Sequence, residues 1–366
     1  MKVTDLNKQY LYIFVFGLVV NLCAFVLQRW IGFEYVLHDD SYEYIEYAQN
    51  FLDSGFELKA FFWLNKLFPF LVYLSLYLSG SVYLITVLNL IIGSFLPIAL
   101  IRLALAVKIK IGDRSVLILG GVLSLLPYTT HLSVNLLKEV LFILLTVEFL
   151  IRVIKKEYLV TLILLILLLW TRNSLAYFMP VAYLAVLLYL IKPTVITTAL
   201  YGLLAIVVVL NTPILDIFER SAFLSLEGRD FFSNLPLVRV TNGYELVLSF
   251  VTSPLKNIFL PNIFTTNNAT ELMYAMHSTV FQITVFLFFA FVITNKISWS
   301  NEMVKLMLFS LICMWFIDVV LPNWGANMRY REAFLLILET MMLATILEIV
   351  QRKTYVSAQV KKMRID

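Results

Sequence analysis

Long runs of apolar residues separated by short polar segments dominate the chain. Crossing the hydrocarbon core of a bilayer as a helix takes about 20 mostly apolar residues. By that measure the candidate spans are 11–29, 82–106, 115–130, 138–154, 158–171, 175–191, 194–211, 276–294, 303–321 and 333–350. The segment 58–79 is ambiguous, because its uninterrupted apolar run, from Phe70 to Leu78, is short. The pattern predicts an all-α polytopic membrane protein with about 10–11 transmembrane helices.

The positions of lysine and arginine predict which loops lie on which side of the membrane. Short cytoplasmic loops are enriched in both residues. If 58–79 does not cross, the basic segments all fall on the side of the N-terminus; they are 108–114, 152–156, Lys192, Lys296 and 352–364. If 58–79 crosses fully, these segments lie outside. We therefore expect 58–79 to lie in the interface or to re-enter as a hairpin, and both termini to be cytoplasmic. The outer loops are then 31–66, 131–137, 172–174, 212–275 and 322–332.

Composition agrees with a single integral-membrane domain over 1–366. The chain has 366 residues, of which 61% are hydrophobic and 14% charged, whereas about a quarter of the residues of a soluble domain are charged. Cys23 and Cys313 both fall inside predicted spans, so no disulfide is expected. No small-residue cleavage site follows the first residues, so we expect the first span to remain as an anchor. Nothing in the sequence indicates nucleic-acid binding.

The first outer loop, 31–66, is acidic and contains an amphipathic segment. Its apolar residues recur at helical spacing, at Tyr44, Tyr47, Ala48, Phe51 and Leu52. This period predicts a helix that lies at the membrane interface and ends near Gly55. The other long outer loop, 212–275, exceeds a simple connection and is expected to carry function or short helices.

Two adjacent aspartates open this amphipathic segment. Asp40 with Glu43 three residues later fits a capping box. Asp39 comes one residue too early to cap the same helix, and a carboxylate held near a membrane without a structural role indicates function. We therefore take Asp39 and Asp40 as the candidate catalytic residues. His38 beside them could hold a divalent cation, although no cluster with recognisable metal-ligand spacing is present.

Basic side chains at the other outer loops form a second group of candidates. Lys138 lies at the edge of an apolar run, and Arg172, Arg329 and Arg331 lie on the side where positive charge is disfavoured. They could pair with the acidic first loop, or they could bind an anionic ligand, since arginine binds phosphate in a bidentate manner. We assign these four residues to a phosphate group. The remaining polar candidates for substrate contacts are His38, Tyr42, His131, Glu139, Asn327 and Tyr330.

These motifs resemble those of the GT-C superfamily of polytopic membrane glycosyltransferases. The similar features are the acidic pair directly after the first span, the polar pair Lys138-Glu139, Arg172 at the start of a span, and the late segment Arg329-Tyr-Arg331. The resemblance implies transfer of a sugar from a polyprenyl-phosphate donor to a glycan, lipid or protein acceptor on the outer face. It implies that an aspartate of the first loop acts as general base and that positive side chains hold the departing lipid phosphate. It further implies a bacterial cytoplasmic membrane and a role in surface glycan or glycoconjugate synthesis.

Two alternatives remain open from the sequence. A polysaccharide-repeat polymerase would also be polytopic with arginines in outer loops, and the long loop 212–275 would suit it. A flippase or other transporter of lipid-linked sugars should carry charges near the membrane midplane. The concentration of unusual charges at one face favours the glycosyltransferase.

Overall fold

The computed structural model describes residues 3–30, 39–53, 66–172, 269–295, 299–320 and 324–363. Within these ranges the regular structure is helical, without a strand. The helices are α1 (Val3–Trp30), α2 (Asp39–Asp53), α3 (Leu67–Ser79), α4 (Tyr83–Ala106), α5 (Asp113–Ser124), α6 (Pro127–Val134), α7 (Glu139–Lys155), α8 (Tyr158–Thr171), α13 (Ala269–Thr294), α14 (Asn301–Val320) and α15 (Trp324–Met363). The prediction of an all-α polytopic membrane protein is confirmed.

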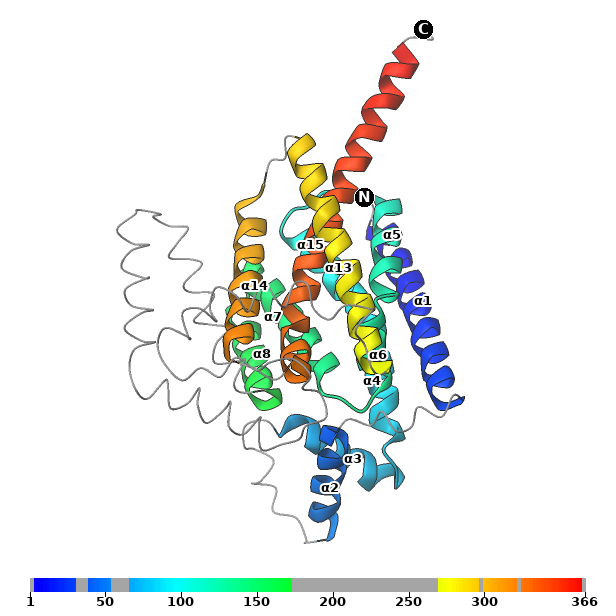
Figure 1. Ribbon diagram of the computed structural model, residues 1–366, viewed down its shortest axis with the longest axis vertical. Helices are drawn as coiled ribbons and strands as arrows, with labels where there is room; N and C mark the ends of the chain where they lie inside the picture. Colours follow the sequence, from blue (N-terminus) through cyan, green and yellow to red (C-terminus); the bar gives the residue numbers. More distant parts are fainter. Residues whose placement is uncertain are drawn as a thin grey trace, which may run out of the picture.

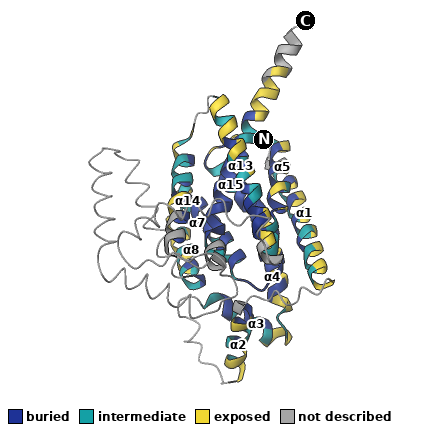
Figure 2. Cartoon of the chain, viewed as in Figure 1, coloured by how far each residue is buried: buried dark blue, intermediate teal, exposed yellow. Residues whose placement is uncertain are grey.

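Several of these helices meet the length and hydropathy that a membrane span requires. Four do so in the described ranges: Leu6–Trp30, Tyr83–Ala106, Leu272–Thr294 and Arg329–Tyr355. If the bent pair of α5 and α6 is counted as one span, the described ranges contain up to five candidate spans. Figure 2 shows the outer face of α1 exposed, and its exposed residues include Leu11 and Val19. Lipid tails are the natural environment for such apolar side chains. The predicted spans 175–191 and 194–211 lie outside the described residues.

The two ends of the helical bundle differ in what they carry. The start of α1 and the end of α15 lie at one end, which we call the termini end, and α2 and α3 lie at the opposite end, the α2 end (Figure 1). The chain leaves α1 and begins α4 at the α2 end, so α3 does not traverse the bundle. Tyr44 of α2 packs edge-on against Phe68 of α3, with 5.2 Å between the ring centroids. The described part of 58–79 thus agrees with the prediction that this segment does not cross.

Small and polar residues join the central helices. Asn21 of α1 donates a hydrogen bond from Nδ2 to Ser94 Oγ of α4, at 3.1 Å. Gly93 of α4 faces Ser133 of α6 so closely that a Cβ added to Gly93 would lie 2.5 Å from Ser133 Cβ and overlap its hydroxyl. Small residues allow such close helix packing in membranes, where apolar burial gives little driving force. This seam between α1, α4 and α6 supports the α2 end of the bundle.

Four predicted boundaries need correction. The predicted span 115–130 is broken, because α5 ends at Ser124 and α6 begins at Pro127, with an angle of 61° between the two helices. Proline suits the first turn of a helix, where the missing N–H is not needed. The predicted loop 131–137 is helical as far as Val134. Likewise, 269–275 belongs to α13 and 324–332 to α15, so both predicted outer loops are shorter at their C-terminal ends.

Candidate functional site

The two candidate catalytic aspartates lie in the first turn of α2. The helix begins at Asp39, which places Asp40 within the first turn and not at the N-cap. The capping box predicted from Asp40 and Glu43 therefore does not start this helix. The backbone N–H groups and dipole of a helix N-terminus favour carboxylates at both positions. The side chains of Asp39 and Asp40, and all of His38, lie outside the described residues. Tyr42 is exposed, with 55% of its surface accessible.

The amphipathic character predicted for α2 is confirmed in its central part. Tyr44 and Ala48 are buried, Tyr47 and Phe51 are half-buried, and Leu52 is exposed. Together with Val72, Ile85 and Leu136, the buried residues form an apolar cluster separate from the main core. Helix α2 therefore packs on the protein through α3, α4 and the segment before α7.

Hydrogen bonds hold α2 against the segment 135–138, which we call the α6–α7 linker. Ser41 Oγ donates to the Leu136 carbonyl at 2.9 Å. Asn89 of α4 donates from Nδ2 to the carbonyls of Asn135, at 2.9 Å, and Leu137, at 3.0 Å. The three carbonyls accept no hydrogen bond within a helix, and these side chains supply donors for them. The side-chain hydrogen bonds therefore hold the linker in place. The start of α2 is thereby placed beside the start of α7.

His131 supports the same linker. Asn135 Nδ2 donates to the His131 carbonyl at 2.7 Å and lies 3.2 Å from His131 Nδ1. Gln28 Nε2 of α1 donates to Asn135 Oδ1 at 2.8 Å. His131 lies within α6, not in an outer loop, and is half-buried.

The linker leads into Lys138 and Glu139, which contact two different elements. Lys138 Nζ lies over the Tyr44 ring of α2, 5.4 Å from its centroid. Glu139, buried at the start of α7, accepts a hydrogen bond through Oε1 from Arg172 Nη2 at the end of α8, at 3.0 Å. Residues that the sequence places in three separate segments thus meet at one end of the bundle.

Arg172 lies at the end of α8, and its side chain is buried, with 2% of its surface exposed. Its guanidinium stacks on Tyr330 of α15, with Cζ 3.5 Å from the ring centroid. Its Nε and Nη1 have no hydrogen-bond partner in the described part of the chain. A buried cation with unused donors is costly, and pairing with Glu139 offsets part of that cost.

The predicted arginines of α15 separate into two environments. Arg329 is half-buried, whereas Arg331 is among the largest fully buried side chains. The side chain of Arg331 packs inside the bundle, with 2% of its surface exposed, and its assignment to a phosphate group stays a prediction. Asn327 lies in the first turns of α15, and its side chain is outside the described set.

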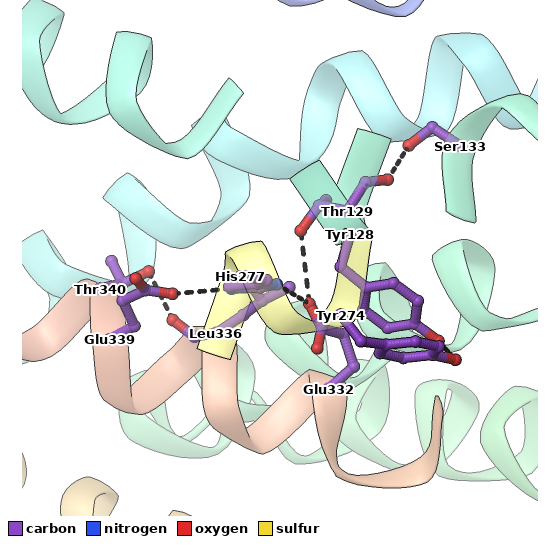
Figure 3. Close-up of polar contacts among 9 residues, drawn as sticks. All are labelled: Tyr128, Thr129, Ser133, Tyr274, His277, Glu332, Leu336, Glu339 and Thr340. Carbon is purple, nitrogen blue, oxygen red and sulfur yellow. Dashed lines mark hydrogen bonds and ion pairs between the residues drawn. The ribbon is translucent and has the colours of Figure 1, made fainter. Parts of the chain in front are cut away.

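A buried acid–histidine cluster was not predicted. His277 of α13 lies between two glutamates of α15, with Nδ1 3.1 Å from Glu332 Oε1 and Nε2 3.0 Å from Glu339 Oε2 (Figure 3). Thr129 Oγ1 also donates to Glu332 Oε1, at 3.5 Å. All three ionisable side chains are at most 3% exposed. A lone histidine in one apolar span and two glutamates seven residues apart in another could have signalled this Glu332–His277–Glu339 cluster.

A pair of tyrosines extends this cluster. The hydroxyls of Tyr128 on α6 and Tyr274 on α13 are hydrogen-bonded to each other, and both rings are buried (Figure 3). Tyr128 also lies near His277, with 6.4 Å between ring centroids. Within the described residues no group of three His, Cys, Asp or Glu side chains has the arrangement of a metal site. The predicted cation alternative at His38, Asp39 and Asp40 lies outside that search.

No protein-family model matches the sequence, no characterised protein matches it significantly, and no solved structure matches the fold significantly. The interpretation of the chain therefore rests on two features of its own structure. These are the helices able to span a membrane and the cluster of polar side chains at the end of the bundle where α2 lies.

Proposed function

We propose that the protein is a membrane glycosyltransferase that transfers a sugar from a polyprenyl-phosphate donor to an acceptor at the α2 end of the bundle. In this proposal the chain lies in a bacterial cytoplasmic membrane, with the termini cytoplasmic and the α2 end external. One observation carries it. The helix that opens with Asp39 and Asp40 is bonded through Ser41 to the linker that presents Lys138, Glu139 and, through Glu139, Arg172.

The chemistry needs a base and a cation at separate positions, and this end of the bundle offers both. A carboxylate of Asp39 or Asp40 would accept the proton of the acceptor hydroxyl as its oxygen attacks the anomeric carbon. The bond from that carbon to the phosphate oxygen breaks, and polyprenyl phosphate leaves. Lys138, Arg329 and the unused donors of Arg172 would stabilise the charge on the departing phosphate.

The test follows release of polyprenyl phosphate by the purified protein in lipid, supplied with a panel of polyprenyl-phosphate sugars and acceptor extracts. We expect release by the wild-type protein and a loss of at least about 100-fold in Asp39→Asn, the usual effect of removing a general base. The matched control is Asp53→Asn, a carboxamide at the exposed far end of the same helix, which should retain full activity.

Three outcomes separate the candidate functions. Equal activity in wild type and Asp39→Asn would remove Asp39 as the base. Consumption of a pyrophosphate-linked oligosaccharide, without use of any monosaccharide donor, would assign the protein as a polymerase. If the protein consumes no donor, a transporter remains as the candidate function.

A transporter is the second candidate, and the Glu332–His277–Glu339 cluster is the observation that favours it. Ionisable side chains inside membrane spans mark proton relays in pumps and transporters. Two carboxylates on one imidazole, buried between α13 and α15, could take up and release a proton. A proton-coupled flippase should move a fluorescent polyprenyl-phosphate sugar across proteoliposomes faster under a proton gradient. His277→Gln should abolish that acceleration, whereas a glycosyltransferase should show no response to the gradient.

A further inference from the structure

A cavity of about 240 Å³ opens at the termini end of the bundle, between the end of α4, the start of α14 and the late part of α15. Its polar lining comes mainly from Lys108, Lys110, Ser300, Glu348 and Arg352, and Trp299 also lines it. We call it the basic cavity. It lies at the opposite end from the candidate active site, so a ligand bound there would be independent of the proposed function.

The charge of the basic cavity is positive. Arg352 pairs with Glu348, the one carboxylate in the lining. Lys108 and Lys110 are exposed and form no ion pair within the described residues. Both residues line the cavity, so they add positive charge beside it that no carboxylate of the described residues pairs with.

The wall that carries these lysines is fixed by contacts to other helices. Ser300 Oγ donates to the Val107 carbonyl at 2.7 Å, and Gly112 N donates to Gln351 Oε1 of α15 at 2.8 Å. Lys108 has a φ of 69°, in the left-handed region that a non-glycine residue adopts at a cost. This conformation closes the C-terminus of α4, where Ile109 N donates to the Ala104 carbonyl at 3.2 Å, so it helps to fix the wall of the cavity.

The depth of the cavity matches the lipid headgroups. The apolar span of α4 ends at Ala106, one residue before the lining begins, and the span of α15 ends at Tyr355, just beyond Arg352. Tryptophan is enriched at the membrane–water interface, where Trp299 would lie. Basic pockets between transmembrane helices bind anionic headgroups. We propose that the basic cavity binds the phosphate of an anionic phospholipid from the adjacent leaflet.

The left-handed conformation of Lys108 supplies a clean test. Lys108→Gly removes the charge without opposing the backbone, because glycine adopts positive φ freely. The matched control is Lys156→Gly, since Lys156 is also left-handed (φ 61°), exposed and at the termini end, but does not line the cavity. Purified protein would be titrated with vesicles of phosphatidylcholine containing phosphatidylglycerol, and bound lipid would be counted by native mass spectrometry.

We expect wild type to prefer phosphatidylglycerol over phosphatidylcholine. Lys108→Gly should weaken phosphatidylglycerol binding about tenfold, the loss of one charge-assisted hydrogen bond. Lys156→Gly should change it less than about twofold, the effect of an exposed charge outside the site. Lys110→Gln provides a second test at the cavity if Lys108→Gly fails to fold.

Three results would overturn the proposal. Equal losses in Lys108→Gly and Lys156→Gly would mean that the surface potential as a whole attracts the lipid. Equal binding of the two lipids by wild type would mean that no headgroup site exists. Binding of inorganic phosphate in place of lipid, without a lipid preference, would assign the cavity to a soluble anion.

Discussion

The two ends of the bundle differ in how far their ion pairs are exposed to solvent. At the termini end the ion pairs are partly exposed: Arg102 with Glu148, Arg152 with Glu157, and Arg352 with Glu348, whose arginine side chain is 56% exposed. At the α2 end Arg172 and Glu139 are 3% and 0% exposed. Exposed pairs contribute little to stability, whereas buried charges are tolerated only with partners. The α2 end thus holds a buried ion pair in which each charge requires its partner, although apolar residues could replace the pair as a whole.

A membrane enzyme would show this asymmetry if chemistry occurs at one face only. The basic residues of the termini end would orient the chain and contact lipid, as the positive-inside rule requires. The buried polar residues of the α2 end would instead be held for a ligand. Substituting a residue of one region and a matched residue elsewhere tests this distinction.

The largest expected effect is all-or-none labelling across the membrane. Tyr77 on α3 and Tyr355 on α15 are exposed to nearly the same extent, 67% and 65%. With Cys23 and Cys313 replaced by alanine, we expect a membrane-impermeant maleimide to label Tyr77→Cys in intact cells and Tyr355→Cys only after permeabilisation. Labelling of both in intact cells would place the two ends on one side and contradict the arrangement of α3. The reversed pattern would place the α2 end in the cytoplasm.

The next largest effect is expected from the buried ion pair. Glu139→Leu leaves Arg172 without a counterion in an apolar setting, and should lower the free energy of unfolding by about 3–5 kcal/mol. The control, Glu157→Gln, breaks the exposed pair with Arg152 and should cost less than about 1 kcal/mol. Urea or SDS titration in detergent measures both.

A double variant sharpens this comparison. Adding Arg172→Met to Glu139→Leu removes the unpaired charge, so we expect most of the lost stability to return, although any activity should not. Equal destabilisation by Glu139→Leu and Glu157→Gln would contradict the distinction between the two ends.

The sequence predicted the α2 end better than the interior. The period of Tyr44, Ala48 and Phe51 and the charges at Lys138, Glu139 and Arg172 are local signals, and helix positions follow from them. The pairing of Arg172 with Glu139 did not follow, because it depends on how α7 and α8 pack. The charge pattern places Arg172 and Arg331 near the ends of predicted spans, but it does not show that the fold buries both side chains.

The Glu332–His277–Glu339 cluster could not be assembled from the sequence for the same reason. Each residue is visible as a polar interruption of an apolar span, and Glu332 and Glu339 share a face of α15 because they are two helical turns apart. Their common partner comes from another helix distant in sequence. Only the packing of α13 on α15 shows that one imidazole contacts both.

An intermediate effect is expected where α4 meets α6 beneath the linker. A methyl group at Gly93 would lie 2.5 Å from Ser133 Cβ, so Gly93→Ala should destabilise by about 1–3 kcal/mol through overpacking. A Cβ added to Gly121 of α5 would have nothing within 4 Å, so Gly121→Ala should be neutral or stabilise by up to about 1 kcal/mol. Combining Gly93→Ala with Ser133→Gly should restore stability. A neutral Gly93→Ala would show that α4 and α6 do not approach as described.

The smallest effect on stability is expected at Ser41, yet it bears most directly on function. Ser41→Ala removes one buried hydrogen bond to the Leu136 carbonyl and should cost about 0.5–1.5 kcal/mol. Ser357→Ala, which removes an exposed bond to the Lys353 carbonyl at the termini end, should cost almost nothing. If α2 must be held against the linker to bring its aspartates near Lys138 and Arg172, sugar transfer should fall in Ser41→Ala by more than its stability loss explains. If Ser41→Ala is fully folded in the assay and its rate of sugar transfer is unchanged, the contact only stabilises the fold. The position of α2 relative to Lys138 and Arg172 would then not matter for activity.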